Sequence, residues 1–261
     1  MPALLPALLD FIAPRHCSVC GKRLAAGEKA LCLSCLLDLN VAEFAKGAAG
    51  NALERTLWGK APIMRAAAFM VYDSHSAQRQ LVLDLKYHNR HRIGYHLGEL
   101  MSRSLMEQHF FDGIDAVVPI PIPVVKRLRR GYNQSEHIAQ GISKATGIRV
   151  DTRIIRRRPY RISQTRLSSF ERVQNVKDTF FLHRADNLQG KHLLIVDDVI
   201  TTTATVRECA MTLTTIPDIK ISVLALAVSK NLIANIRKSN PEEETNTQLL
   251  FTDTKESKNN N

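Results

Sequence analysis

Apolar runs alternate with amphipathic stretches along most of the chain. Runs with the length and β-branched content of buried strands lie at residues 66–72, 115–121, 193–196 and 219–228, and a shorter one lies at 148–155. Between them, apolar side chains recur with helical spacing at residues 76–87, 93–105, 133–147 and 205–213. Strands that alternate with helices predict an α/β fold in which helices flank a parallel sheet.

The apolar run at 193–196 ends in two acids, Asp197 and Asp198, and small or hydroxyl-bearing residues follow at 201–205. This order predicts a strand, an acidic turn and a phosphate-binding loop before the next helix. Loop amides and the positive end of a helix dipole bind phosphate, and the acids then face sugar hydroxyls or a divalent cation. The alternatives are a turn-capping role for the acids, or a P-loop NTPase strand, which the absence of a G-x-x-x-x-G-K-[ST] segment disfavours.

A basic segment follows the second predicted strand. Prolines at 119, 121 and 123 end that strand, and residues 126–131 then predict a basic loop. Asn133, with Glu136 three residues later, predicts the cap of the next helix. In a parallel sheet, ligands bind at the carboxyl ends of the strands. The basic loop and the acidic, threonine-rich loop both leave that edge, so the sequence predicts a site for an anionic ligand there.

Residues 156–175 are basic and polar, with Pro159 among them and no hydrophobic period. A loop of this length inside a compact domain is typical of a lid or a binding element. Its arginines and their neighbours form either a solvated face or a nucleic-acid surface, and the sequence leaves both open. They are Arg153, Arg156, Arg157, Arg158, Arg161, Arg166 and Arg172.

Four of the five cysteines form two C-x-x-C pairs, Cys17 with Cys20 and Cys32 with Cys35. Two turns that each present two thiolates can close a tetrahedral four-sulfur zinc site, so this spacing predicts structural zinc. Disulfides or a redox pair are the alternative, although neither pair lies in a strand–helix unit. His16 could compete as a ligand, and a solvent-facing histidine is the simpler interpretation. The fifth cysteine, Cys209, lies on the apolar face of its predicted helix and is expected in the core.

The charge balance of 36 Lys and Arg against 25 Asp and Glu leaves +11, which favours a polyanionic partner such as DNA, RNA or a phosphorylated metabolite. Residues 1–12 are apolar but lack the basic start and cleavage site of a signal peptide. No segment approaches the roughly 20 apolar residues needed to span a bilayer, so we expect no membrane insertion and a cytoplasmic location.

These patterns predict a division of the chain into four parts. Residues 1–45 are expected to form a zinc-binding module, 46–61 a linker with some helix, and 62–230 the α/β domain. From residue 231 the composition turns to Asn, Glu, Lys and Thr, so 231–261 are expected to be a disordered tail.

Several of these motifs together resemble a known family. Residues 196–205 resemble the phosphoribosyl-pyrophosphate signature of type I phosphoribosyltransferases. The paired C-x-x-C motifs, Lys86-Tyr87, residues 130–134, and residues 164–172 with Asn175 resemble ComF-type proteins. The resemblance implies a type I phosphoribosyltransferase-like sheet with an N-terminal zinc module, and phosphoribosyl pyrophosphate with Mg²⁺ as ligands. In competent bacteria it implies a role in DNA uptake, in which the protein handles incoming single-stranded DNA beside a helicase.

The resemblance also implies a role for each site residue. Asp197 and Asp198 would hold the ribose hydroxyls, and the loop at 121–130 would face the pyrophosphate. The 5-phosphate would lie in the loop of Thr201, Thr202, Thr203, Ala204 and Thr205, and the basic groups would be Lys126, Arg127 and Arg130.

One residue departs from the family pattern. The family loop usually has glycine where Thr203 stands, and glycine permits close approach of the backbone to phosphate and unusual backbone dihedrals. A β-branched residue there puts the transferase activity in question while leaving the fold intact. Two functions therefore stay open: a transferase that displaces pyrophosphate, and a non-catalytic adaptor for single-stranded DNA or a helicase with a vestigial site.

Overall fold

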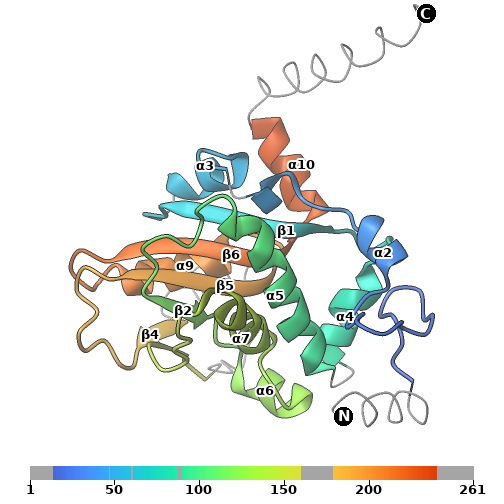
Figure 1. Ribbon diagram of the computed structural model, residues 1–261. Helices are drawn as coiled ribbons and strands as arrows, with labels where there is room; N and C mark the ends of the chain where they lie inside the picture. The colour runs from blue at the N-terminus through green and yellow to red at the C-terminus, as the bar shows by residue number, and fades with distance from the viewer. Residues whose placement is uncertain (1–13, 47, 60, 88–89, 160–178, 240–261) are drawn as a thin grey trace, which may run out of the picture.

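The computed structural model describes residues 14–46, 48–59, 61–87, 90–159 and 179–239 (Figure 1). Its centre is a four-stranded parallel sheet in the order β1-β6-β5-β2. The strands are β1 (Arg65–Tyr72), β2 (Ala116–Pro119), β5 (His192–Ile200) and β6 (Lys220–Ser229). The α/β fold and its parallel sheet are therefore confirmed, and each strand lies within a few residues of its predicted position.

Helices cover both faces of the sheet, which is why the central strands β5 and β6 are apolar almost throughout. One core contains residues from α3 (Ala52–Trp58), α9 (Ala204–Leu213) and α10 (Lys230–Ser239). The other contains residues from α4 (Arg79–Tyr87), α5 (His91–Met106), α7 (Gln134–Thr146) and the cysteine segment. Short elements complete the chain: α2 (Leu33–Leu37), the 3-10 helix Glu43–Lys46 and α6 (Val124–Arg130).

Helices α5 and α7 lie side by side on the sheet, and two glycines allow their close approach (Figure 1). A Cβ atom added at Gly98 would lie 2.2 Å from the Ile138 carbonyl oxygen, and one at Gly141 would lie 2.0 Å from the Tyr95 carbonyl oxygen. Any side chain there would collide with backbone. The glycines thus set the distance between α5 and α7.

Two predicted elements need correction. The strand expected at 148–155 does not form in the main sheet. Only an isolated bridge between Val150 and Val117 joins this segment to β2. Instead β3 (Ile155–Arg157) pairs antiparallel with β4 (Phe180–Leu182) in a sheet of its own. The expected basic loop at 126–131 is wrong as well, because Val124–Arg130 form helix α6. Pro123 precedes that helix instead of interrupting it, and Gly131, at φ 80°, ends it.

The end of the described chain is more ordered than its composition predicts. Residues 231–239, expected to be disordered, belong to α10, so that prediction is wrong for them; residues 240–261 lie outside the described chain. Leu232, Ile233 and Ile236 form a short apolar stripe that packs into the core among polar neighbours. Helix α3, in the expected linker, likewise buries Leu53 and Leu57 completely. The division into domains stays a prediction.

Most of the predicted lid lies outside the described chain, since residues 160–178 are not described. Its first residues, Arg156 and Arg157, belong to β3. In the part of the chain that the structure describes, no helix is both long and apolar enough to cross a membrane.

Candidate functional site

The two predicted site acids lie on β5, near its carboxyl end. The strand pairs with β6 as far as Ile200, which lies opposite Val228. Asp197 and Asp198 therefore lie within the strand, and the prediction that they form a turn is wrong. Both acids are partly exposed while the five strand residues before them are buried. The acids therefore interrupt a buried strand instead of ending it, since Val199 and Ile200 after them are buried again.

Two side chains, one from α4 and one from α7, contact the acids. Lys86, in the last turn of α4, places its Nζ 3.2 Å from Oδ2 of Asp198. Ser135, in the first turn of α7, lies with its Oγ 3.5 Å from Oδ1 of Asp197, at the outer limit of a hydrogen bond. The backbone amides of Asp198 and Val199 also donate to the two carboxylates, at 2.8 and 2.7 Å. The acids are thus held by a cation and by amides.

Asp197 has a strongly shifted pKa. Desolvation by the surrounding protein and the neighbouring charge of Asp198 raise the pKa from its ordinary value of 3.8 to about 7. The amide of Asp198, the charge of Lys86 and Ser135 act in the opposite direction. Two adjacent carboxyls therefore share a site that disfavours a double negative charge, and a bound cation or a hydrogen-bond donor would relieve this repulsion.

The predicted phosphate loop follows directly. Thr201, Thr202 and Thr203 form bends after β5, and α9 begins at Ala204, with Thr205 in its first turn. Thr201 and Thr202 are exposed, and the Thr201 carbonyl accepts a hydrogen bond from Ser229 Oγ at 3.3 Å. Thr203 has φ −74° and ψ −7°, an ordinary right-handed conformation. The backbone at this position therefore does not require glycine, although the question of close approach to a phosphate is separate.

Helix α6 carries the predicted basic residues. Arg130 donates to Oε1 of Gln134 at 2.9 Å, and Gln134 directly precedes Ser135, the neighbour of Asp197. Arg127 instead lies 3.4 Å from Glu136, and Lys126 is exposed. Arg130 is thus connected with the acids through α7, because Gln134 contacts Arg130 and the next residue, Ser135, contacts Asp197. Lys126 and Arg127 lie on the same helix as Arg130, but within the described chain neither forms a hydrogen bond or ion pair with the acids.

The segment between α6 and α7 ties these elements together. Tyr132 Oη donates to the Leu85 carbonyl at 2.7 Å, and Asn133, the N-cap of α7, donates to the Ile120 carbonyl at 2.9 Å. Asn133 Oδ1 also accepts from the Ser135 amide, which confirms Asn133 as the predicted cap. Gln134 is fully buried, and its Nε2 has no hydrogen-bond partner among the residues that the structure describes.

Lys86 and Ser135 were not among the residues assigned from the sequence to the site. Lys86 entered only as part of a family motif, and Ser135 lies inside a predicted helix cap. Lys86 precedes Asp198 by more than a hundred residues, so only the packing of α4 beside β5 brings the two side chains together. A basic residue in the last turn of a helix was the one local signal that could have indicated Lys86.

The four predicted metal ligands meet at one point. The Sγ atoms of Cys17, Cys20, Cys32 and Cys35 all lie within 4.8 Å of one another, and those of Cys20 and Cys32 are 3.7 Å apart. Four thiolates at about 2.3 Å from a tetrahedral zinc ion would lie about 3.8 Å from each other. All four are free thiols, which disfavours the disulfide alternative. The cluster has the donors and the size for a metal such as zinc.

Local turns build this cluster. The Gly21 amide donates to the Cys17 carbonyl at 2.9 Å, and Gly21, at φ 71°, takes a conformation that favours glycine. Burial raises the pKa of the Cys17 thiol, but hydrogen bonds from the amides of Cys20, Cys32 and Val19 lower it to about 7 overall. Such amides stabilise a thiolate, which is the form that binds metal.

The remaining histidine and cysteine agree with the simpler interpretations. His16 is exposed and is not part of the cluster among the described residues. Cys209 is fully buried in the core, and burial, followed by the charges of Asp197 and Glu208, raises the pKa of its thiol. Cys209 is thus a protonated core residue, as predicted.

An α/β protein with an acidic, threonine-rich strand end and a four-cysteine module has relatives among named proteins. DNA utilization protein YhgH of Escherichia coli O6:H1 (strain CFT073) is 31% identical over 200 residues, which cover 76% of this chain and 83% of that protein. Competence protein F of Haemophilus influenzae is 30% identical over 151 residues, 56% of this chain and 66% of that protein. No family model matches the chain. The chain belongs to the ComF family, together with these proteins.

Solved structures give a weaker likeness. An allosteric regulatory enzyme of purine biosynthesis matches with a TM-score of 0.37 and 19% identity, over 54% of this chain and 30% of that one. A glutamine phosphoribosylpyrophosphate amidotransferase from B. subtilis matches with a TM-score of 0.36 and 18% identity, over the same shares of the two chains. Since these scores are low, we assign the fold of this chain from its own sheet topology. Its family membership follows from the sequence relatives.

Proposed function

We propose that this chain binds phosphoribosyl pyrophosphate with Mg²⁺ at the carboxyl end of β5, in a role linked to DNA uptake and natural transformation. The observation that carries the proposal is the order of groups there: Asp197 and Asp198, three threonines, and the start of α9. Carboxylates accept hydrogen bonds from sugar hydroxyls, and the amino end of a ten-residue helix attracts a phosphate. The names of the relatives, DNA utilization and competence proteins, support the cellular role.

Each part of the ligand has a group to receive it. The 5-phosphate would lie at Thr201–Thr205, where exposed hydroxyls add donors to the backbone amides. The ribose hydroxyls would face Asp197 and Asp198, and ribose binding would compete with Lys86 for Asp198. The pyrophosphate would face Arg130 and the other cations of α6, because a strongly charged anion binds where positive charge is concentrated.

The chemistry that such a site supports is displacement of pyrophosphate from the anomeric carbon. The bond between that carbon and the pyrophosphate oxygen breaks while an acceptor nucleophile forms the new bond, through a cation-like transition state. When bound, Mg²⁺ supplies charge neutralisation for the leaving pyrophosphate. The carboxylates of Asp197 and Asp198 would orient the ribose and stabilise its positive charge.

Calorimetry with phosphoribosyl pyrophosphate and Mg²⁺ tests the proposal. We expect saturable binding that weakens at least about tenfold in Asp198→Asn, since one charged hydrogen bond contributes about 1.5–3 kcal/mol. Asp112→Asn is the matched control, because Asp112 is 74% exposed and pairs only with the neighbouring His109 in the described chain. Absence of binding by the folded wild-type protein, or an equal loss in both variants, would contradict the proposal.

A second function is favoured by a different observation. Strand β3 carries Arg157 and is followed by Arg158, and their guanidinium carbons lie 5.2 Å from the ring centroids of Phe180 and Phe181 on β4. Arg156 and Arg158 are exposed. Exposed cations on a two-stranded ribbon are suited to the phosphate backbone of single-stranded DNA. An adaptor role would use this surface whether or not the site at β5 catalyses a reaction.

Fluorescence anisotropy with a labelled oligo-dT measures this second function. Changing all three arginines of 156–158 to glutamine should lower the salt slope of binding by about 2, since each phosphate contact on single strands contributes roughly 0.7. The control changes three exposed cations elsewhere, Arg103, Lys144 and Lys220, to glutamine. Equal effects in both variants would remove β3 as the surface. Release of pyrophosphate separates the transferase from the adaptor.

We also propose that the four-cysteine cluster binds zinc and that the zinc is structural. Four sulfur ligands leave no open coordination position for a substrate. The segment around them buries few large side chains of its own, so a bound metal would stabilise its fold.

A further inference from the structure

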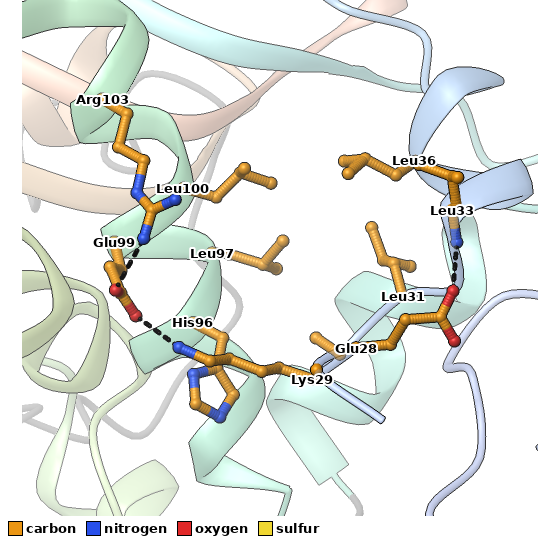
Figure 2. A pocket seen from close by; sticks show the side chains of 12 residues that line it. Glu28, Lys29, Leu31, Leu33, Leu36, His96, Leu97, Glu99, Leu100 and Arg103 are labelled. Carbon is orange, nitrogen blue, oxygen red and sulfur yellow. Dashed lines mark hydrogen bonds and ion pairs between the residues drawn. The ribbon is translucent and has the colours of Figure 1, made fainter. Parts of the chain in front are cut away.

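A groove with a volume of about 300 Å³ lies between the cysteine segment and helix α5. Leu31 and Leu36 line it from the cysteine side, and Leu97 and Leu100 line it from α5. Figure 2 shows Leu31 and Leu36 pointing across an open space toward Leu97 and Leu100. The two walls are therefore apolar and face each other without meeting. The volume is at the lower end of the roughly 300–1,000 Å³ of ligand pockets and would hold a few apolar side chains.

The surroundings of the groove are apolar on one side and charged on the other. Leu33, which also lines the groove, is 61% exposed, and Leu37 of the same short helix is 77% exposed. Along the α5 side, Glu99 accepts from Lys29 at 3.0 Å and from Arg103 at 3.1 Å (Figure 2). An exposed cluster of leucines beside an ion-pair network is typical of a surface that is covered by another segment.

We infer that the N-terminal residues 1–12 of this chain cover the groove, with Leu5, Leu8, Leu9 and Ile12 inserted between its walls. These four residues follow the i, i+3, i+4, i+7 spacing of an apolar helix stripe. The stripe from 5 to 12 spans seven residue steps, about 10 Å in a helix, as does the α5 wall from His96 to Arg103. The recognition mode is an apolar segment in an apolar groove.

The described chain begins next to the groove. Arg15 donates from its guanidinium to the Glu28 carbonyl at 2.5 Å, and the Leu24 amide donates to the Arg15 carbonyl at 2.8 Å. Glu28 is itself a lining residue of the groove. The chain therefore enters the described structure at the groove wall, and residue 12 is only three residues away from this anchor.

The tether also favours this occupant. Asp10 is the only charged side chain among residues 1–13, so the segment would bring little charge to the groove, whose rim carries two acids and two cations, Glu28, Lys29, Glu99 and Arg103. A segment tethered at the groove wall has an effective concentration in the millimolar range, which a free partner rarely reaches. Residues 1–12 are therefore favoured over a second copy of the chain or a separate apolar ligand. This docking does not depend on ligand binding at β5.

Photo-crosslinking in the full-length protein tests the inference. A benzophenone side chain is placed at Leu33, which is exposed enough to tolerate it, and crosslinked peptides are identified by mass spectrometry. We expect crosslinks to residues 5–12. Leu8→Glu should reduce the yield at least about fivefold, because it puts a charge between apolar walls, while Ala7→Glu, on the opposite side of the stripe, should leave it unchanged. A benzophenone at Val125, exposed on α6, gives the background.

Each outcome decides the question. Crosslinks to residues 5–12 of the same chain that Leu8→Glu removes would support the inference. The experiment is run on a mixture of isotope-labelled and unlabelled chains, so a crosslink between two chains would show that a second copy occupies the groove and would overturn it. Crosslinks that Leu8→Glu does not affect, or a yield equal to that at Val125, would also overturn it. Hydrogen exchange at residues 96–103 should rise in Leu8→Glu only.

Discussion

The cysteine cluster and the acid site were both expected from the sequence, but the chain builds them in different ways. The cysteines lie within 19 consecutive positions, 17 to 35, and turns such as the one at Gly21 bring their sulfurs within 4.8 Å of one another. The acid site needs α4, β5, α6 and α7, whose contacts join residues far apart in the chain, as between Lys86 and Asp198.

This difference explains what each site tolerates. A cluster closed by local turns depends on its ligands and on the metal that they hold. A site assembled from distant elements depends on the packing that positions them, so changes well away from the acids can alter it. Four predictions test this contrast, in order of decreasing effect.

The largest effect is expected from Cys32→Ala. Removing one of four thiolates should reduce bound zinc from about one per chain to almost none and lower the free energy of unfolding by roughly 5 kcal/mol or more, since metal binding is part of the folding energy of such modules. Metal analysis and urea denaturation measure both. Cys209→Ala is the control: it should keep the zinc and cost about 1 kcal/mol through its small cavity. Full zinc content in Cys32→Ala would refute the four-sulfur site.

The next effect concerns helix packing behind the acid site. In Gly141→Ala the new Cβ would lie 2.0 Å from the Tyr95 carbonyl oxygen, so α7 must move away from α5. We expect a loss of about 1–3 kcal/mol of stability and weaker binding of phosphoribosyl pyrophosphate, because α7 carries Ser135. Gly59→Ala has open space and an ordinary φ of −71°, and should change neither property. Equal effects of the two substitutions would show that close helix packing does not support the site.

A smaller effect is expected in the pH dependence of stability. The pKa of Asp197 is raised from 3.8 to about 7, so between these values the folded protein holds a proton that the unfolded chain releases. The stabilisation from this proton is complete below about pH 4 and is lost as the pH rises through about 7. Asp197→Asn should therefore make the free energy of unfolding less dependent on pH between about 4 and 7. Urea denaturation across this range measures it, and an unchanged slope would contradict the shift.

The smallest effect is expected from Tyr132→Phe. This change removes only the hydrogen bond from Tyr132 Oη to the Leu85 carbonyl, one residue before Lys86. A hydrogen bond of this kind contributes about 0.5–1.5 kcal/mol, and we expect a loss within that range together with slightly weaker ligand binding. Urea denaturation and calorimetry would detect it. A stability loss with no change in binding would mean that the position of α4 does not depend on this bond.

Local patterns explain why much of the fold was predictable. The β-branched, apolar runs of β5 and β6 occur because both faces are covered, and their composition shows it directly. The doubled C-x-x-C spacing likewise contained all the information needed for the cluster.

Other features depend on contacts that no local pattern contains. Helix α6 consists of exposed basic and apolar residues, with Leu128 79% exposed, so it has no buried stripe to reveal it. The ion pair between Lys86 and Asp198 follows from topology alone. Glycine was expected at the position of Thr203 from family pattern, but the backbone there is right-handed, so the dihedral argument against threonine does not apply.

Helix α10 has a practical consequence for anyone who shortens this protein. The polar composition after residue 230 invites truncation there, yet such a cut would remove Leu232, Ile233 and Ile236 from the core and uncover the apolar surface beneath them. Truncated chains of that kind would be prone to aggregate during purification. Trimming after residue 239 keeps all three side chains, so soluble yield should fall sharply between these two end points.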